Sequence, residues 1–173
     1  MKRKSSPKFI LGYTDTETVK LDLDDVSFQR VKYWALVTAK RFSLRGFIIL
    51  KSSRNSYHVV FDRPVSWVRN VAIVAWVCLM TKHRKLTEWL IMQCIKHAST
   101  LRLSPKKEKP APRIIYRHGT QNEQVSNFLR YRKVVQTIIG RLDWWRALNK
   151  SDLMSKRVFP RACRETQSKN SLQ

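Results

Sequence analysis

Acidic residues are scarce in this chain. Only 12 Asp and Glu residues stand against 35 Lys and Arg residues, so its 173 residues carry a formal charge of +23 at pH 7. This imbalance excludes the near-neutral surface of a generic enzyme. It predicts a polyanionic partner, with nucleic acid ahead of an anionic membrane.

Cysteine and long apolar runs are also scarce. The three cysteines, Cys78, Cys94 and Cys163, are an odd and widely spaced set, which argues against a disulfide framework and fits a reducing compartment. The most apolar stretch, residues 71–80, is shorter than the roughly 20 residues that cross a bilayer. The basic start of the chain leads into no hydrophobic signal segment. We therefore expect a cytoplasmic protein with no membrane partner.

The hydrophobic pattern predicts an alternation of strands and helices. Period-two alternation indicates strands, and apolar residues every three to four positions indicate helices. Strands are expected at residues 18–23, 47–50, 56–61, 100–104 and 113–117. Helices are expected at residues 26–42, 67–81, 87–96 and 123–139. Asp24 or Asp25 is expected to cap the first helix and Ser66 the second.

The order of these elements predicts an α+β domain built on the split βαβ plan, an antiparallel-rich sheet with helices packed on one face. No internal repeat and no Gly/Ser linker divides the chain. We expect one domain over residues 9–148, preceded by a basic arm at residues 1–8 and followed by a loose basic tail at residues 149–173.

In three of the expected strands, large apolar residues fall on one face and chemically reactive residues fall on the other. If the apolar sides all meet the helices, the reactive side chains share the open face of the sheet. The residues expected on the open face are Asp22, Asp24, Ser56, His58, Arg102 and Ser104.

Asp22 and Asp24 are the centre of this face. Residues i and i+2 of a strand lie about 6.5 Å apart and point the same way, so their carboxylates repel each other. A divalent cation such as Mg²⁺ or Mn²⁺ relieves this repulsion, and two such ions can support an in-line attack on phosphorus. The alternative is a solvated strand end beside a helix cap.

The other reactive residues fit a phosphate ligand. Ser56 and His58 can hydrogen-bond a bound phosphate, and His58 can serve in proton transfer. Arg102 and Lys106 supply cations for a triphosphate. The alternatives are a satisfied structural histidine and a solvated basic turn. Zinc is not expected, because the spacing of cysteines and histidines over residues 78–97 matches no zinc knuckle.

Two segments together resemble a known family. V-K-L-D-L-D at residues 19–24, followed by L-K-S-S-R-N-S-Y-H-V-V-F at residues 50–61, resembles the archaeo-eukaryotic primase superfamily, which includes primase-polymerases of archaeal plasmids and viruses. That family carries D-x-D on one strand and S-x-H about thirty residues later. Here 34 positions separate Asp24 from His58. T-L-R-L-S-P-K at residues 100–106 is similar to the family's basic strand near the incoming nucleotide.

The resemblance implies an RRM-like catalytic core and a metal-dependent nucleotidyltransferase that acts on single-stranded nucleic acid. Its partners would be a DNA or RNA template, nucleoside triphosphates and a helicase or other replication proteins, in the host cytoplasm if the source is a virus. Asp22, Asp24 and His58 would be catalytic, with Asp22 and Asp24 holding two Mg²⁺ or Mn²⁺ ions. The nucleotide would be bound by Ser56, His58, Arg102, Ser104 and Lys106. The basic surface for the template would include Lys51, Arg54, Arg113 and Arg117.

The third acid of the family has no obvious counterpart. The family usually supplies a further Asp between S-x-H and the basic strand, whereas this chain has no Asp between Asp62 and Asp143. Glu88 is the only acid from Arg63 to Lys107, so it is the candidate third ligand. Without a third ligand the chain could be an RRM-like single-strand binder that does not catalyse. A binder explains the charge equally well but explains the Asp22–Asp24 pair poorly.

Overall fold

The computed structural model describes residues 10–107 and 109–155, and their side chains as far as Leu142. The basic arm expected at residues 1–8 and residues 156–173 of the expected tail lie outside the described residues. None of the helices in the described part is both long enough and apolar enough to cross a membrane.

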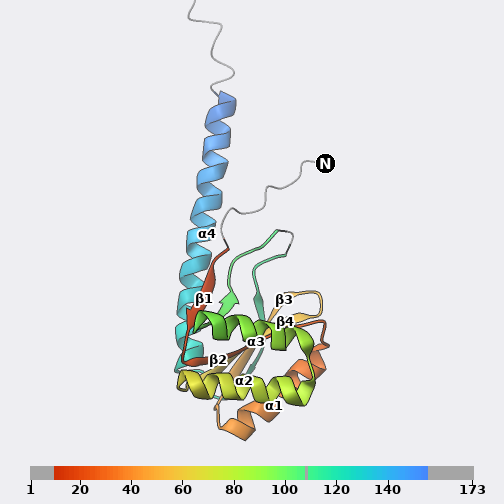
Figure 1. Ribbon diagram of the computed structural model, residues 1–173. Coiled ribbons are helices and arrows are strands. Elements are labelled where there is room, and N and C mark those ends of the chain that lie inside the picture. Colours follow the sequence, from red (N-terminus) through yellow and green to blue (C-terminus); the bar gives the residue numbers. More distant parts are fainter. Residues whose placement is uncertain (1–9, 108, 156–173) are drawn as a thin grey trace, which may run out of the picture. The chain divides into compact units, whose positions relative to one another are not determined.

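The chain folds as an α+β protein with antiparallel sheets (Figure 1). Its elements are β1 (Gly12–Asp15), β2 (Thr18–Asp24), α1 (Phe28–Phe42), β3 (Phe47–Ser53), β4 (Ser56–Pro64), α2 (Trp67–Thr81), α3 (Arg84–Lys96), β5 (Ser99–Arg102), β6 (Arg113–His118) and α4 (Gln124–Ser155). The main sheet has the order β2-β4-β3-β6, and β1 pairs separately with β5. Because β2 and β3 are both antiparallel to β4, they run parallel to each other and are connected through α1.

One face of the main sheet is covered by three helices. Figure 1 shows α2 and α3 side by side, and both contact β2. α1 buries Val31, Ala35 and Ala39, whose spacing of four aligns them on one side of the helix. These residues pack in one cluster with Leu21 of β2 and Val59 of β4.

The other face of the sheet is buried as well. Ile48 and Val60 of the main sheet pack there with Leu101 of β5 and with Val125 and Phe128 of α4. The expectation that helices cover only one face, and that the opposite face is open, is therefore wrong.

The alternation correctly places Asp22, Asp24, Ser56 and His58 on this face. The expectation that Arg102 and Ser104 share it as part of the same sheet is wrong, because β5 pairs with β1 in a separate sheet that helps to cover this face.

Helix α1 begins later than expected. Ser27 is its N-cap, and its side chain accepts a hydrogen bond from the backbone N–H of Arg30. Asp24 ends β2, and Asp25 has a φ of 58°, whereas an N-cap needs extended backbone, so the prediction of either residue as the cap is wrong. The predicted cap of α2, Ser66, is confirmed by its bond from the N–H of Arg69.

Helix α4 continues to Ser155, so residues 149–155 are helical where a loose tail was expected. By its internal contacts the chain divides into two units, Met1–Val135 and Gln136–Gln173. The described part of the second unit is the remainder of α4. The first unit contains every candidate site residue.

A buried lysine joins the β1–β5 pair to the main sheet. Lys20 of β2 is fully buried, and its Nζ lies 3.1 Å from Asp15 Oδ1 and donates to the carbonyl of Ser99 at 2.9 Å. The same ammonium lies 4.6 Å from the centre of the Tyr13 ring. Three contacts to β1 and β5 therefore compensate the buried charge.

This lysine should make stability depend on pH. Burial lowers the pKa of Lys20 from 10.5 to about 8, although Asp15 opposes the change. Between pH 8 and 10.5 the unfolded chain then binds more protons than the folded chain, so the free energy of unfolding should rise as pH increases over this range. The full shift corresponds to about 3 kcal/mol. Urea unfolding at a series of pH values should show this rise in the wild type and in the exposed-site control Lys40→Met, but not in Lys20→Met. Equal slopes in all three proteins would contradict the assignment.

A buried carboxylate fixes the start of α4. Asp62 of β4 is fully buried and accepts hydrogen bonds from the backbone N–H groups of Asn122, Glu123 and Val125 at 3.0–3.2 Å. Asp62 thus acts as an N-cap contributed by a distant strand. Its negative charge also interacts favourably with the positive end of the helix dipole.

Removing this cap should destabilise the first unit. We expect Asp62→Ala to lower the free energy of unfolding by about 2–3 kcal/mol, because buried N–H groups lose their acceptor. Asp62→Asn keeps one acceptor oxygen and should cost less. Urea unfolding of both variants measures the difference, and an unchanged midpoint for Asp62→Ala would disprove the capping role.

Candidate active site

The pairing of β2 with β4 brings the predicted acidic and histidine residues together. In the antiparallel register Asp22 lies opposite His58, and Asp24 lies opposite Ser56. The Oδ1 atom of Asp22 is 3.4 Å from the Nε2 atom of His58. The D-x-D and S-x-H segments, far apart in sequence, therefore meet side by side on one face of the sheet.

His58 is almost completely buried, with 3% of its surface exposed. Burial, and then the nearby Arg102, lower its pKa to about 3, so the ring is neutral at pH 7. Its Nδ1 atom is buried and has no hydrogen-bond partner among the described residues. A buried polar atom without a partner is costly and marks a position where a ligand or a structural change can supply one.

The carboxyl group of Asp22 has an unusually high pKa. Burial, and then the neighbouring charge of Asp24, raise its pKa from 3.8 to about 7. Arg102, Lys109 and Lys106 act in the opposite direction. The partly buried carboxyl of Asp22, with 30% of its side-chain surface exposed, is therefore acted on by one like charge and three cations.

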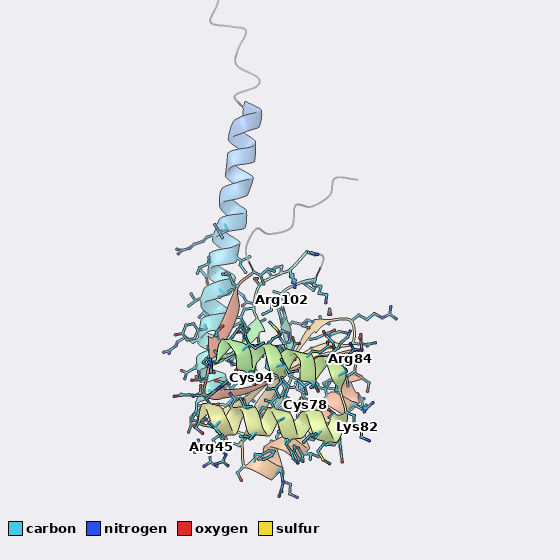
Figure 2. The ribbon with its side chains drawn as sticks, viewed as in Figure 1. Arg45, Cys78, Lys82, Arg84, Cys94 and Arg102 are labelled. Atoms are coloured by element: carbon cyan, nitrogen blue, oxygen red, sulfur yellow. The ribbon has the colours of Figure 1, made fainter. Side chains whose placement is uncertain are left out.

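Arg102 lies at the end of β5, close to the loop that leads to β6 (Figure 2). Its guanidinium donates hydrogen bonds to the backbone carbonyls of Ser104, of Pro110 at 2.9 Å and of Ser52 at 3.1 Å. The side chain therefore ties β3 to the β5–β6 loop while its charge acts on Asp22 and Asp24. This bracing role was not predicted.

The two predicted serines are buried, and their hydroxyl groups already form hydrogen bonds within the protein. Ser104 accepts a hydrogen bond from the Leu11 N–H at 2.8 Å and donates to the carbonyl of Pro105 at 3.3 Å. Ser56 donates to the carbonyl of Arg54 at 3.4 Å. By contrast, the side chain of Lys106 is exposed at the turn where its backbone pairs with Lys109.

Glu88 lies on α3, where its exposed carboxylate accepts a hydrogen bond from Arg84 Nε at 2.8 Å. No described hydrogen bond or ion pair links it to Asp22 or Asp24. In the described part of the chain, no three His, Cys, Asp or Glu side chains form a group that could hold a metal ion.

Two carboxylates nevertheless fit one kind of metal site. Mg²⁺ usually keeps several waters and binds through one or two carboxylates together with the phosphates of a substrate. The raised pKa of Asp22, which the charge of Asp24 helps to cause, reflects a repulsion that such a cation relieves. The donor set therefore fits an ion that binds together with a nucleotide rather than a cage made by the protein alone.

Three of the four basic residues predicted for the template lie together. Lys51, Arg54 and Arg113 line one cavity, which Lys109 also lines. Arg117 does not line it, and instead donates to Gln121 Oε1 at 2.6 Å. Lys109 was not named as a site residue, although its place in a lysine-rich turn is a visible signal.

Comparisons of the chain with protein families, with curated proteins and with solved structures found no match.

The pKa of Asp22 can be tested by removing its neighbours one at a time. Asp24→Asn removes the like charge and should lower this pKa, whereas Arg102→Gln removes a cation and should raise it. Carbon-detected NMR titration of the Asp22 carboxyl measures both changes. Shifts in the same direction for the two variants would contradict the described electrostatics.

Proposed function

We propose that this chain is a metal-dependent nucleotidyltransferase of the primase or primase-polymerase type, acting on single-stranded nucleic acid. The observation that carries the proposal is the β2–β4 register, which sets Asp22 against His58 beside the cations Arg102 and Lys106. The connection of β2 to β3 through α1, with β4 inserted between them, also supports a core that contains a split βαβ unit. The last strand, β6, pairs with β3 rather than with β2, which departs from the RRM-like strand order.

In this proposal Asp22 and Asp24 hold a divalent cation together with the nucleotide phosphates. The ion would neutralise negative charge on the phosphates and favour attack by a hydroxyl group. His58 orients the Asp22 carboxyl through its Nε2 atom, and its neutral ring suits hydrogen bonding better than charge pairing. Arg102 and Lys106 supply positive charge near the phosphates.

A non-catalytic single-strand-binding protein is the second candidate. The observation that favours it is the position of Glu88, which is paired with Arg84, so that no third carboxylate among the described residues joins Asp22 and Asp24. The cavity lined by Lys51, Arg54 and Arg113 serves either candidate, because phosphate binding precedes any chemistry.

Primer synthesis and extension on a single-stranded template, with Mg²⁺ or Mn²⁺ and nucleoside triphosphates, tests the proposal. The double variant Asp22→Asn with Asp24→Asn should lose at least about a hundredfold in rate, because both proposed ligands are replaced by amides. Asp25→Asn with Glu17→Gln is the matched control, since it makes the same charge change at two exposed acids and should keep wild-type activity.

Glu88→Gln is measured in the same assay. If the metal concentration that gives half-maximal activity is unchanged, Glu88 is excluded as a ligand. A tenfold increase in that concentration would support Glu88 as a ligand. Wild-type protein that makes no product but binds single strands in a salt-dependent way would favour the second candidate. Activity that survives in the Asp22 and Asp24 double variant would refute the proposed mechanism.

A further inference from the structure

A basic cavity lies where β3 turns into β4. Its volume is about 540 Å³, within the range of small-molecule sites. Four cationic residues line it: Lys51, Arg54, Lys109 and Arg113. No carboxylate is among the described residues of the lining.

Two of these cations oppose each other across the sheet. Lys51 of β3 and Arg113 of β6 are direct cross-strand partners. Like charges in this position destabilise an antiparallel pair. No described residue accepts a hydrogen bond from, or forms an ion pair with, the side chains of Lys51, Arg54 or Arg113. The described residues therefore leave this repulsion uncompensated.

Hydrogen bonds from one arginine connect two of the segments that line the cavity. Ser52, on β3, and Pro110, in the β5–β6 loop, both line the cavity, and Arg102 donates hydrogen bonds to the carbonyls of both. Arg102, whose position is shown in Figure 2, thus braces the two sides at a fixed separation. Its charge also acts on Asp22 and Asp24, so the same side chain links the cavity to the acidic pair.

We propose that this cavity binds adjacent phosphate groups. Several cations that converge without a counter-ion among the described residues provide the charge that phosphate oxygens need, and the arginines can contact two oxygens at once. The phosphates belong either to a nucleoside triphosphate or to consecutive nucleotides of a single strand. The proposal deepens the proposed function and rests on it for the identity of the phosphate carrier, whereas phosphate binding itself needs no catalysis.

Charge-removing variants test the cavity. Lys51→Gln with Arg113→Gln is compared with Arg30→Gln plus Arg69→Gln, which makes the same charge change at exposed positions on α1 and α2. Binding of inorganic tripolyphosphate, a nucleoside triphosphate and a labelled single-stranded oligonucleotide is measured against salt concentration. Loss of two phosphate contacts should reduce the salt slope for the oligonucleotide by about 1.4 and weaken binding about twenty-fivefold at 0.1 M salt.

The cavity variant should also unfold at the same temperature as the wild type or a higher one, because the repulsion between residues 51 and 113 is removed. Loss confined to the triphosphate probes assigns the cavity to the nucleotide, and loss confined to the oligonucleotide assigns it to the strand. Equal losses in the cavity variant and the control, or no loss in either, would overturn the proposal. A lower unfolding temperature would also overturn it, since these cations would then serve the fold.

The two proposals fail separately. Wild-type protein without primer synthesis would refute the nucleotidyltransferase, while the difference between the cavity variant and its control would still decide phosphate binding. The Asp22 and Asp24 double variant should bind tripolyphosphate without metal at least as well as the wild type, because it removes negative charge near the cavity.

Discussion

The antiparallel pairing of β2 with β4 is the interaction on which the rest of the structure depends. It sets which side chains of both strands face α1 and α2 and which face the second cluster around Phe128. Because side chains alternate along a strand, a slip of one residue would move Asp22 and Asp24 into the apolar cluster beneath the helices. The two buried clusters therefore fix the register, and the register brings Asp22 to His58.

Burial of both sheet faces gives the site its electrostatic character. On this face His58 is buried and Asp22 is partly buried, so the histidine is neutral and the carboxyl is hard to ionise. An open sheet face would leave both groups near their ordinary pKa values. Arg102, half-buried at the edge of this face, then acts on Asp22 through a medium that screens charge less than water does. A site of this kind suits a ligand that brings both metal and phosphate.

Much of the main sheet could be predicted from the sequence, because short-range alternation determines it. The alternation around Leu21 and Val59 correctly predicted the strands and the residues that share a face with Asp22. Strand β1 was not predicted, because its four residues carry little pattern and it is held by its pairing with β5, more than eighty positions further along the chain. Nor does the sequence reveal that Asp62 caps α4 or that Arg102 braces a cavity, since both depend on partners far along the chain.

In the proposed function, Asp22 and Asp24 bind a divalent cation together with nucleotide phosphates. Paramagnetic broadening of assigned amide NMR signals by substoichiometric Mn²⁺, with a nucleoside triphosphate present, tests it most directly. The account predicts that signals of Asp22, Asp24 and the facing His58 broaden first, and that replacing both aspartates with asparagine abolishes the effect. Broadening centred instead on the exposed acids Asp25 and Glu88, or an unchanged response in the double variant, would contradict it.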